Sequence, residues 1–139
     1  MENYKITLRT LTRGKGESPQ TYEMTTTGEL FSLKNGCYKI RYNETTPDGT
    51  EFKNIVTVKG NAGAKVSRQG EYDTDFTLDT DKKHLCLINT PFGELSFGVL
   101  THAIRNNLTE SGGELYFKYT LDANNRFISD NEVQLKITQ

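Results

Sequence analysis

The sequence predicts an all-β fold: a single antiparallel barrel of about eight to ten strands, connected mostly as an up-and-down meander. Apolar and polar residues alternate along most of the chain, as they do in strands with one buried face. Turn signals recur at intervals of roughly 8–12 residues, and no segment keeps a helical period for three turns. These observations fit a sandwich or a closed barrel, and closure is favoured because it removes exposed edges.

The first part of the chain reads as two strands. Alternation begins at Tyr4 and continues through Leu8, and a polar, glycine-rich loop follows over residues 13–19. The second strand runs to Gly28, where the alternation changes phase because Phe31 is apolar and odd-numbered. A glycine at a phase change predicts a bulge or a sharp bend.

The rest of the chain continues as strands separated by turns. Asn35–Gly36 predicts a tight hairpin, because both central residues of a type I′ turn need positive φ. The strand over residues 38–44 follows, and Pro47–Asp48–Gly49 predicts the next turn. Residues 102–108 fit a strand better than a helical turn. The other predicted strands cover residues 52–59, 64–68, 72–78, 84–89, 95–101, 115–121 and 133–137.

Length and composition narrow the class of protein. The 139 residues suit one domain, residues 1–139, with a real core. The formal net charge is −1 and the basic residues are scattered, which argues against nucleic acid and anionic membranes as partners. The N-terminus lacks a signal-peptide pattern and no apolar stretch is long enough to span a bilayer, so we expect a cytoplasmic protein. Cys37 and Cys86 are therefore expected to be reduced thiols that serve in packing.

Catalytic and metal-binding signals are weak. His84 and His102 are the only histidines, and neither has a partner at metal-ligand spacing. His84 follows a lysine-rich turn and is expected to be exposed. The acidic residues between 73 and 81 do not follow the calcium-loop pattern, so no metal and no cofactor are expected. We therefore expect no enzymatic activity; the enzyme alternative would need His102 beside Glu44 or an aspartate in one cleft.

One strand carries a charge on its apolar face. Tyr38, Ile40 and Tyr42 share a parity, and Glu44 follows them onto the same side. A carboxylate in that position is costly unless it is paired, hydrogen-bonded or near the rim. Arg68 follows the inward parity of its own strand, so the sequence predicts a Glu44–Arg68 ion pair inside the barrel. Breaking a buried pair costs about 3–5 kcal/mol.

This pair allows two main interpretations. In the first, it anchors a small, partly apolar anionic ligand in the barrel interior: Arg68 grips the anion, Glu44 lies beside it, and Tyr42 and Tyr119 add hydroxyl donors. In the second, the pair is structural, the barrel is filled, and the protein is an interaction or assembly module, for example a homo-oligomer. A third arrangement leaves Glu44 solvated at the rim.

The order of several short motifs also carries a resemblance. They are Tyr4–Thr10, Thr27–Gly28, Ile40–Glu44, Arg68–Gly70, Thr90–Leu95, Thr101, Gly113–Leu115, Tyr119 and Asn131–Val133. With these motifs the chain resembles, nearly end to end, the YwiB-like family of small bacterial barrels of the calycin (lipocalin-like) type. The resemblance implies a single calycin-like barrel. It implies no activity and assigns no catalytic residue, since barrels of this shape serve many functions.

Overall fold

The chain forms a closed barrel in a computed structural model that describes residues 4–71 and 73–139. Each strand pairs with the next in antiparallel fashion, and the last described strand pairs with the first. In chain order the strands are β1 (Tyr4–Gly14), β2 (Gln20–Ser32), β3 (Cys37–Thr45), β4 (Glu51–Lys59), β5 (Gly63–Gln69), β6 (Thr74–Asp79), β7 (His84–Thr90), β8 (Gly93–Thr109), β9 (Gly112–Ala123) and β10 (Arg126–Thr138). This architecture confirms the predicted fold class and is consistent with a calycin-like barrel.

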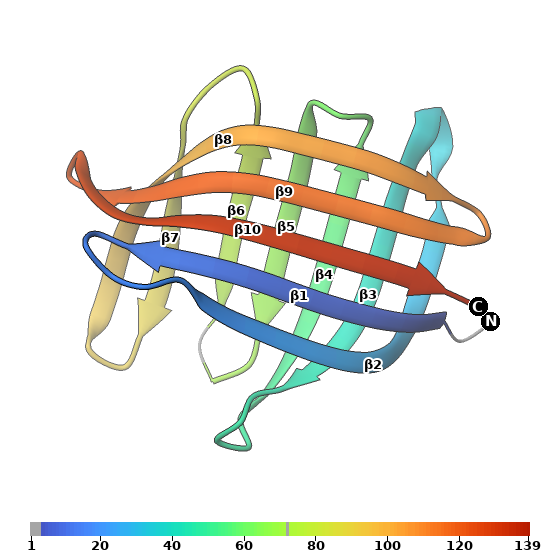
Figure 1. The fold of residues 1–139 in the computed structure, drawn as a ribbon, viewed down its shortest axis with the longest axis horizontal. Coiled ribbons are helices and arrows are strands. Elements are labelled where there is room, and N and C mark those ends of the chain that lie inside the picture. The colour runs from blue at the N-terminus through green and yellow to red at the C-terminus, as the bar shows by residue number, and fades with distance from the viewer. Residues whose placement is uncertain (1–3, 72) are drawn as a thin grey trace.

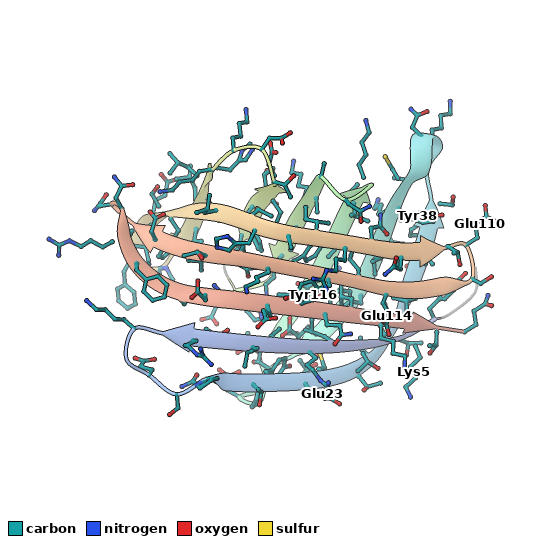
Figure 2. The ribbon with its side chains drawn as sticks, turned by 45° about the horizontal axis from the view of Figure 1, so that its top comes forward. Lys5, Glu23, Tyr38, Glu110, Glu114 and Tyr116 are labelled. Carbon is teal, nitrogen blue, oxygen red and sulfur yellow. The ribbon has the colours of Figure 1, made fainter. Side chains whose placement is uncertain are left out.

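Two layers of strands cross each other to enclose the interior. Figure 1 shows β1, β8, β9, β10 and most of β2 in one layer, with β3 to β7 running steeply across behind them. The outer face is polar: Figure 2 shows Lys5, Glu23 and Tyr116 on the outside of the first layer. The side chains that alternate with these along each strand point inward, because successive residues of a strand face opposite ways.

Aliphatic and aromatic residues of both layers fill much of the interior. Phe117 is buried on β9, and Ile40, Val58 and Leu78 are buried on the opposite layer. Each apolar side chain that faces inward removes apolar surface from water, and this burial stabilises the fold by about 25 cal/mol for each Å². The two thiols are free, and Cys86 is part of this core while Cys37 is half-buried.

The turns largely follow the predictions. Asn35 adopts a φ of 61°, and with Gly36 it connects β2 to β3 as a tight hairpin through the short helical turn Lys34–Gly36. Residues 46–50 connect β3 to β4, and residues 102–108 lie within β8, as a strand. β8 also contains a register shift between Thr101 and Ala103. The predicted strand over 72–78 begins at Thr74, and Tyr72 lies outside the described residues.

The predicted change of phase at Gly28 is wrong. Leu30 packs against the core, so the even residues of β2 continue to face inward. Phe31 faces outward instead, where Lys39 and Arg41 lie 5.8 and 5.4 Å from its ring centroid. These cations cover an aromatic ring on the outer surface, and a simple alternation pattern takes that ring for a core residue.

Gly28 serves a close approach between strands. It pairs with both neighbouring strands in the stretch where β2 passes from one layer to the other (Figure 1). A Cβ atom at this position would lie 2.4 Å from Ile6 Cδ1 and 2.5 Å from the Arg41 carbonyl oxygen. Any side chain would therefore separate β2 from its neighbours.

Candidate functional site

A cavity of about 400 Å³ lies in the barrel interior. This volume falls within the range of about 300–1,000 Å³ that is usual for small-molecule sites. Its apolar walls come from both layers: Leu8, Pro47, Val56, Val66, Phe76, Phe117, Val133 and Leu135. Its polar groups are Thr10, Tyr22, Tyr42, Glu44, Thr46, Asn54, Arg68 and Tyr119.

The register of the second layer places the main polar groups together. Tyr42 on β3 pairs with Asn54 on β4, and Asn54 pairs with Arg68 on β5. Residues in one such row point to the same face of the sheet. Glu44 is two residues beyond Tyr42, so it faces the same side and reaches the row diagonally.

Glu44 and Arg68 form the predicted ion pair. Arg68 Nη2 lies 3.3 Å from Glu44 Oε1, and Asn54 Nδ2 donates a hydrogen bond of 3.2 Å to the same oxygen. The Glu44 side chain is only 9% exposed and the Arg68 side chain is 34% exposed. The pair is therefore internal, and the rim arrangement with a solvated Glu44 does not occur.

Phe52 supports the guanidinium of Arg68 from another side. The Arg68 Cζ atom lies 3.8 Å from the centroid of the Phe52 ring, a close cation–π contact. Gly70 leaves room for that ring, since a Cβ atom there would lie 2.6 Å from Phe52 Cδ1. Arg68 Nε is buried, and it has no hydrogen-bond partner among the described residues. Arg68 is thus held in place with a donor still unsatisfied.

Three tyrosines complete the polar side of the cavity. Burial, and then the Glu44 carboxylate, raise the pKa of Tyr42 far above its ordinary value. Burial raises the pKa of Tyr119 to about 12. Burial also raises the pKa of Tyr22, with a further contribution from the Glu44 carboxylate that its hydroxyl faces. All three hydroxyls therefore remain protonated donors at neutral pH.

The structure brings together all four residues that the sequence assigned to the site: Glu44, Arg68, Tyr42 and Tyr119 line one cavity. Sequence reasoning missed Asn54, Phe52 and Tyr22 as members. A signal for the first two was present, because counting outward from the Pro47–Gly49 turn pairs Glu44 with Phe52 and Tyr42 with Asn54.

The two histidines lie away from this cavity. His84 is half-buried rather than exposed, and its Nε2 lies 3.0 Å from Asp79 Oδ2. His102 is exposed, and its Nε2 lies 2.6 Å from Thr120 Oγ1. The Thr120 hydroxyl in turn donates to Asp130. The structure does not bring His102 to Glu44, which faces the interior.

The described part of the chain contains neither a metal site nor a membrane-spanning helix. Within residues 4–71 and 73–139, no group of three or more His, Cys, Asp or Glu side chains could hold a metal ion. No helix in that part is long and apolar enough to cross a membrane.

Comparison with known proteins identifies the family. The family described as "Domain of unknown function (DUF1934)" matches residues 6–135. The crystal structure of the ywiB protein from Bacillus subtilis is similar, with a TM-score of 0.75 and 20% identity over 99% of this chain and 92% of that chain. At this identity the likeness shows the fold, and it confirms the YwiB-like resemblance. No curated protein sequence matches. The match over residues 6–135 shows that the chain belongs to the DUF1934 family.

Proposed function

We propose that this protein is a non-enzymatic, cytoplasmic binding protein that holds a small, partly apolar anionic ligand inside its barrel. One observation carries the proposal: a single cavity of about 400 Å³ joins apolar walls to Arg68 and several tyrosine hydroxyls. A filled barrel would have offered no such space.

Each part of the cavity suits one part of such a ligand. The apolar walls favour a hydrocarbon or aromatic body, because its transfer from water is favourable by about 25 cal/mol for each Å² buried. A guanidinium offers several N–H donors in a fork that matches carboxylate, sulfonate or phosphate oxygens. Phe52 and Glu44 already hold Arg68 in position, so little conformational entropy remains to be lost when a ligand binds.

The test compares Arg68, which faces the barrel interior, with Arg41, which faces outward. Binding of the fluorescent anion 1-anilinonaphthalene-8-sulfonate, and of decanoate by calorimetry, is measured for the wild type, Arg68→Met and Arg41→Met. Arg41 is on the outer face, paired with Glu29. We expect Arg68→Met to weaken both affinities about tenfold or more, and Arg41→Met to leave them unchanged.

A cavity-filling variant gives a second, independent arm. Val66→Phe adds a ring to the cavity wall, whereas Lys65→Phe adds the same ring to an exposed position on the same strand. Only the first should displace the probes. The proposal fails if the wild type binds neither probe, or if Arg68→Met and Val66→Phe both bind them as the wild type does. Circular dichroism confirms that each variant is folded.

A second candidate function is assembly with another copy of this chain. The side chains of Leu85 and Leu87 on β7 and of Leu100 on β8 are exposed on the outer face, and exposed apolar groups are typical of association surfaces. The adjoining β6–β7 pairing is reduced to two residue pairs. Light scattering on the wild type and Leu85→Lys tests this candidate, which predicts a dimer that the substitution dissociates. A monomeric wild type at high concentration rejects it.

A further inference from the structure

We infer that Glu44 is a built-in competitor for Arg68, so that an anionic ligand binds only together with one proton taken from solvent. This inference rests on the proposed function and adds its regulation: the barrel would hold acidic ligands more tightly as the pH falls.

The competition follows from the geometry of Arg68. Glu44 Oε1 already lies 3.3 Å from Arg68 Nη2, and both side chains line the cavity. Asn54 fixes this carboxylate through a hydrogen bond to the same oxygen. An anionic head group that reaches Arg68 must therefore lie within a few ångströms of a carboxylate that is almost wholly shielded from water.

The charges that face the cavity balance only when it is empty. Glu44 on β3 and Arg68 on β5 are its two charged side chains, one of each sign. The titratable groups facing them from other strands are tyrosines, Tyr22 on β2 and Tyr119 on β9, with Tyr42 on β3 itself. Tyrosine hydroxyls are neutral at physiological pH. A bound anion thus leaves one uncompensated negative charge.

Nearby charges outside the cavity do not offset that excess. Glu44 also borders a second cavity of about 330 Å³, together with Glu51 and Lys53 of β4. Both of these side chains are exposed and opposite in sign, so solvent screens them and their effects cancel. Two negative charges beside one guanidinium repel each other, and this repulsion favours proton binding by one of the two acidic groups.

Protonation converts Glu44 from a competitor into a donor. A protonated carboxyl keeps one oxygen that can accept the Asn54 hydrogen bond and gains an O–H that can donate to the ligand. Arg68 is then released to pair with the ligand anion. No bond other than the O–H bond of Glu44 is formed, and the proton comes from bulk water.

The experiment uses a probe that cannot itself take up the proton. The sulfonate of 1-anilinonaphthalene-8-sulfonate stays ionised between about pH 5.5 and 8.5, so any proton bound belongs to the protein. Affinity is measured across this range for the wild type, Glu44→Gln and Glu29→Gln. Glu29 is the matched control, since it pairs with Arg41 on the outer face.

Three results are expected from the affinity measurements. Wild-type affinity falls with rising pH, by up to about tenfold for each pH unit, as binding coupled to one proton requires. Glu44→Gln binds about tenfold or more tightly than the wild type at pH 8 and shows no such slope. Glu29→Gln behaves as the wild type. Calorimetry in buffers of different ionisation enthalpy gives close to one proton taken up by the wild type at pH 8, a result that needs no variant.

The inference is overturned if Glu44→Gln binds the probe no more tightly than the wild type, if the slope persists in that variant, or if the wild type takes up no proton. In those cases binding that still depends on Arg68 leaves the proposed function intact. If the wild type does not bind the probe at any pH, both are overturned.

Discussion

Arg68 and Arg41 make the same two kinds of contact on opposite sides of the barrel wall. Arg68 pairs with Glu44 and lies over a phenylalanine in the interior. Arg41 pairs with Glu29 at 2.7 Å and lies over Phe31 outside. Solvent and salt screen the outer pair, whereas the inner pair lies in a region of low dielectric. The same contacts should therefore differ in their effect on stability.

Arg68→Met is expected to lower the free energy of unfolding by about 2–3 kcal/mol, because it leaves a buried carboxylate with its counter-ion removed. Because Arg68 is partly exposed, this loss lies at or below the lower end of the range of about 3–5 kcal/mol that is usual for a buried pair. Arg41→Met should cost less than about 1 kcal/mol. Urea unfolding of both variants, and of the double variant Glu44→Gln/Arg68→Met, measures these values. Equal losses for the two single variants, or no recovery in the double variant, would contradict the expectation.

The buried tyrosines make stability fall at alkaline pH. Burial, and secondarily the Glu44 carboxylate, raise the pKa of Tyr42 in the folded protein. In the unfolded chain the same hydroxyl has a pKa of about 10. Below that pH both states keep the proton and the contribution of Tyr42 is complete. Above it the unfolded state releases its proton first, so the free energy of unfolding falls as pH rises, by up to about 1.4 kcal/mol for each unit.

Tyr42→Phe removes this proton and should reduce the loss of stability between pH 9 and 11.5. Urea unfolding at both pH values measures the change against the wild type. The ultraviolet titration of the wild type should show Tyr42 and Tyr119 ionising only as the protein unfolds. An identical alkaline loss in Tyr42→Phe and the wild type would show that this hydroxyl is not protected.

At the level of the strand, two glycines of the sheet provide a test of close approach. Gly28→Ala would place a Cβ atom 2.4 Å from Ile6 Cδ1, and overpacking of this kind costs about 1–3 kcal/mol. Gly63→Ala meets nothing nearer than the Leu78 carbonyl oxygen at 3.9 Å. Thermal unfolding should show a clear loss for the first variant and almost none for the second. A stable Gly28→Ala would mean that β2 can move away from its neighbours.

Strand alternation and turn chemistry predicted most of the second layer. The parity of Tyr38 to Glu44 identified the inner face, and turn residues such as Asn35–Gly36 marked where strands end. Alternation failed at Phe31, because an aromatic ring covered by cations looks like a core residue in the sequence. Local patterns also fail to predict the role of Asn54, because the reason for an inward polar residue is seen only when its partners on the neighbouring strands are known.

The site was predicted in part for a similar reason. Glu44 and Arg68 could be paired from their parity alone, because each was a charge on an apolar face. Whether space remained around them depends on how the strands close, and no single strand carries that information. The cavity beside Arg68 therefore had to come from the structure.

For the whole molecule, the pairing of β1 with β10 places the two ends of the described chain side by side (Figure 1), with Lys5 opposite Thr138. Joining these ends with a short glycine–serine linker and opening the exposed loop at residues 15–18 should preserve the barrel. We expect the free energy of unfolding of this permutant to remain within about 2 kcal/mol of the wild type. Its probe affinity should also be unchanged.

Urea unfolding and probe titration measure both quantities. A permutant opened within β3 serves as the control, because a break there interrupts the strand that carries Glu44. If the permutant opened in the loop also fails to fold, the order in which the strands are connected matters beyond their final pairing.

The same closure sets an order of events during synthesis. β1 leaves the ribosome before β2 to β9, and its partner β10 leaves it after them. Until residues 126–138 emerge, β1 has an open edge that can pair with other chains. The cavity also lacks the wall formed by Val133 and Leu135. A nascent chain that still lacks β10 thus has no complete binding site, and a ligand can stabilise only chains from which β10 has emerged.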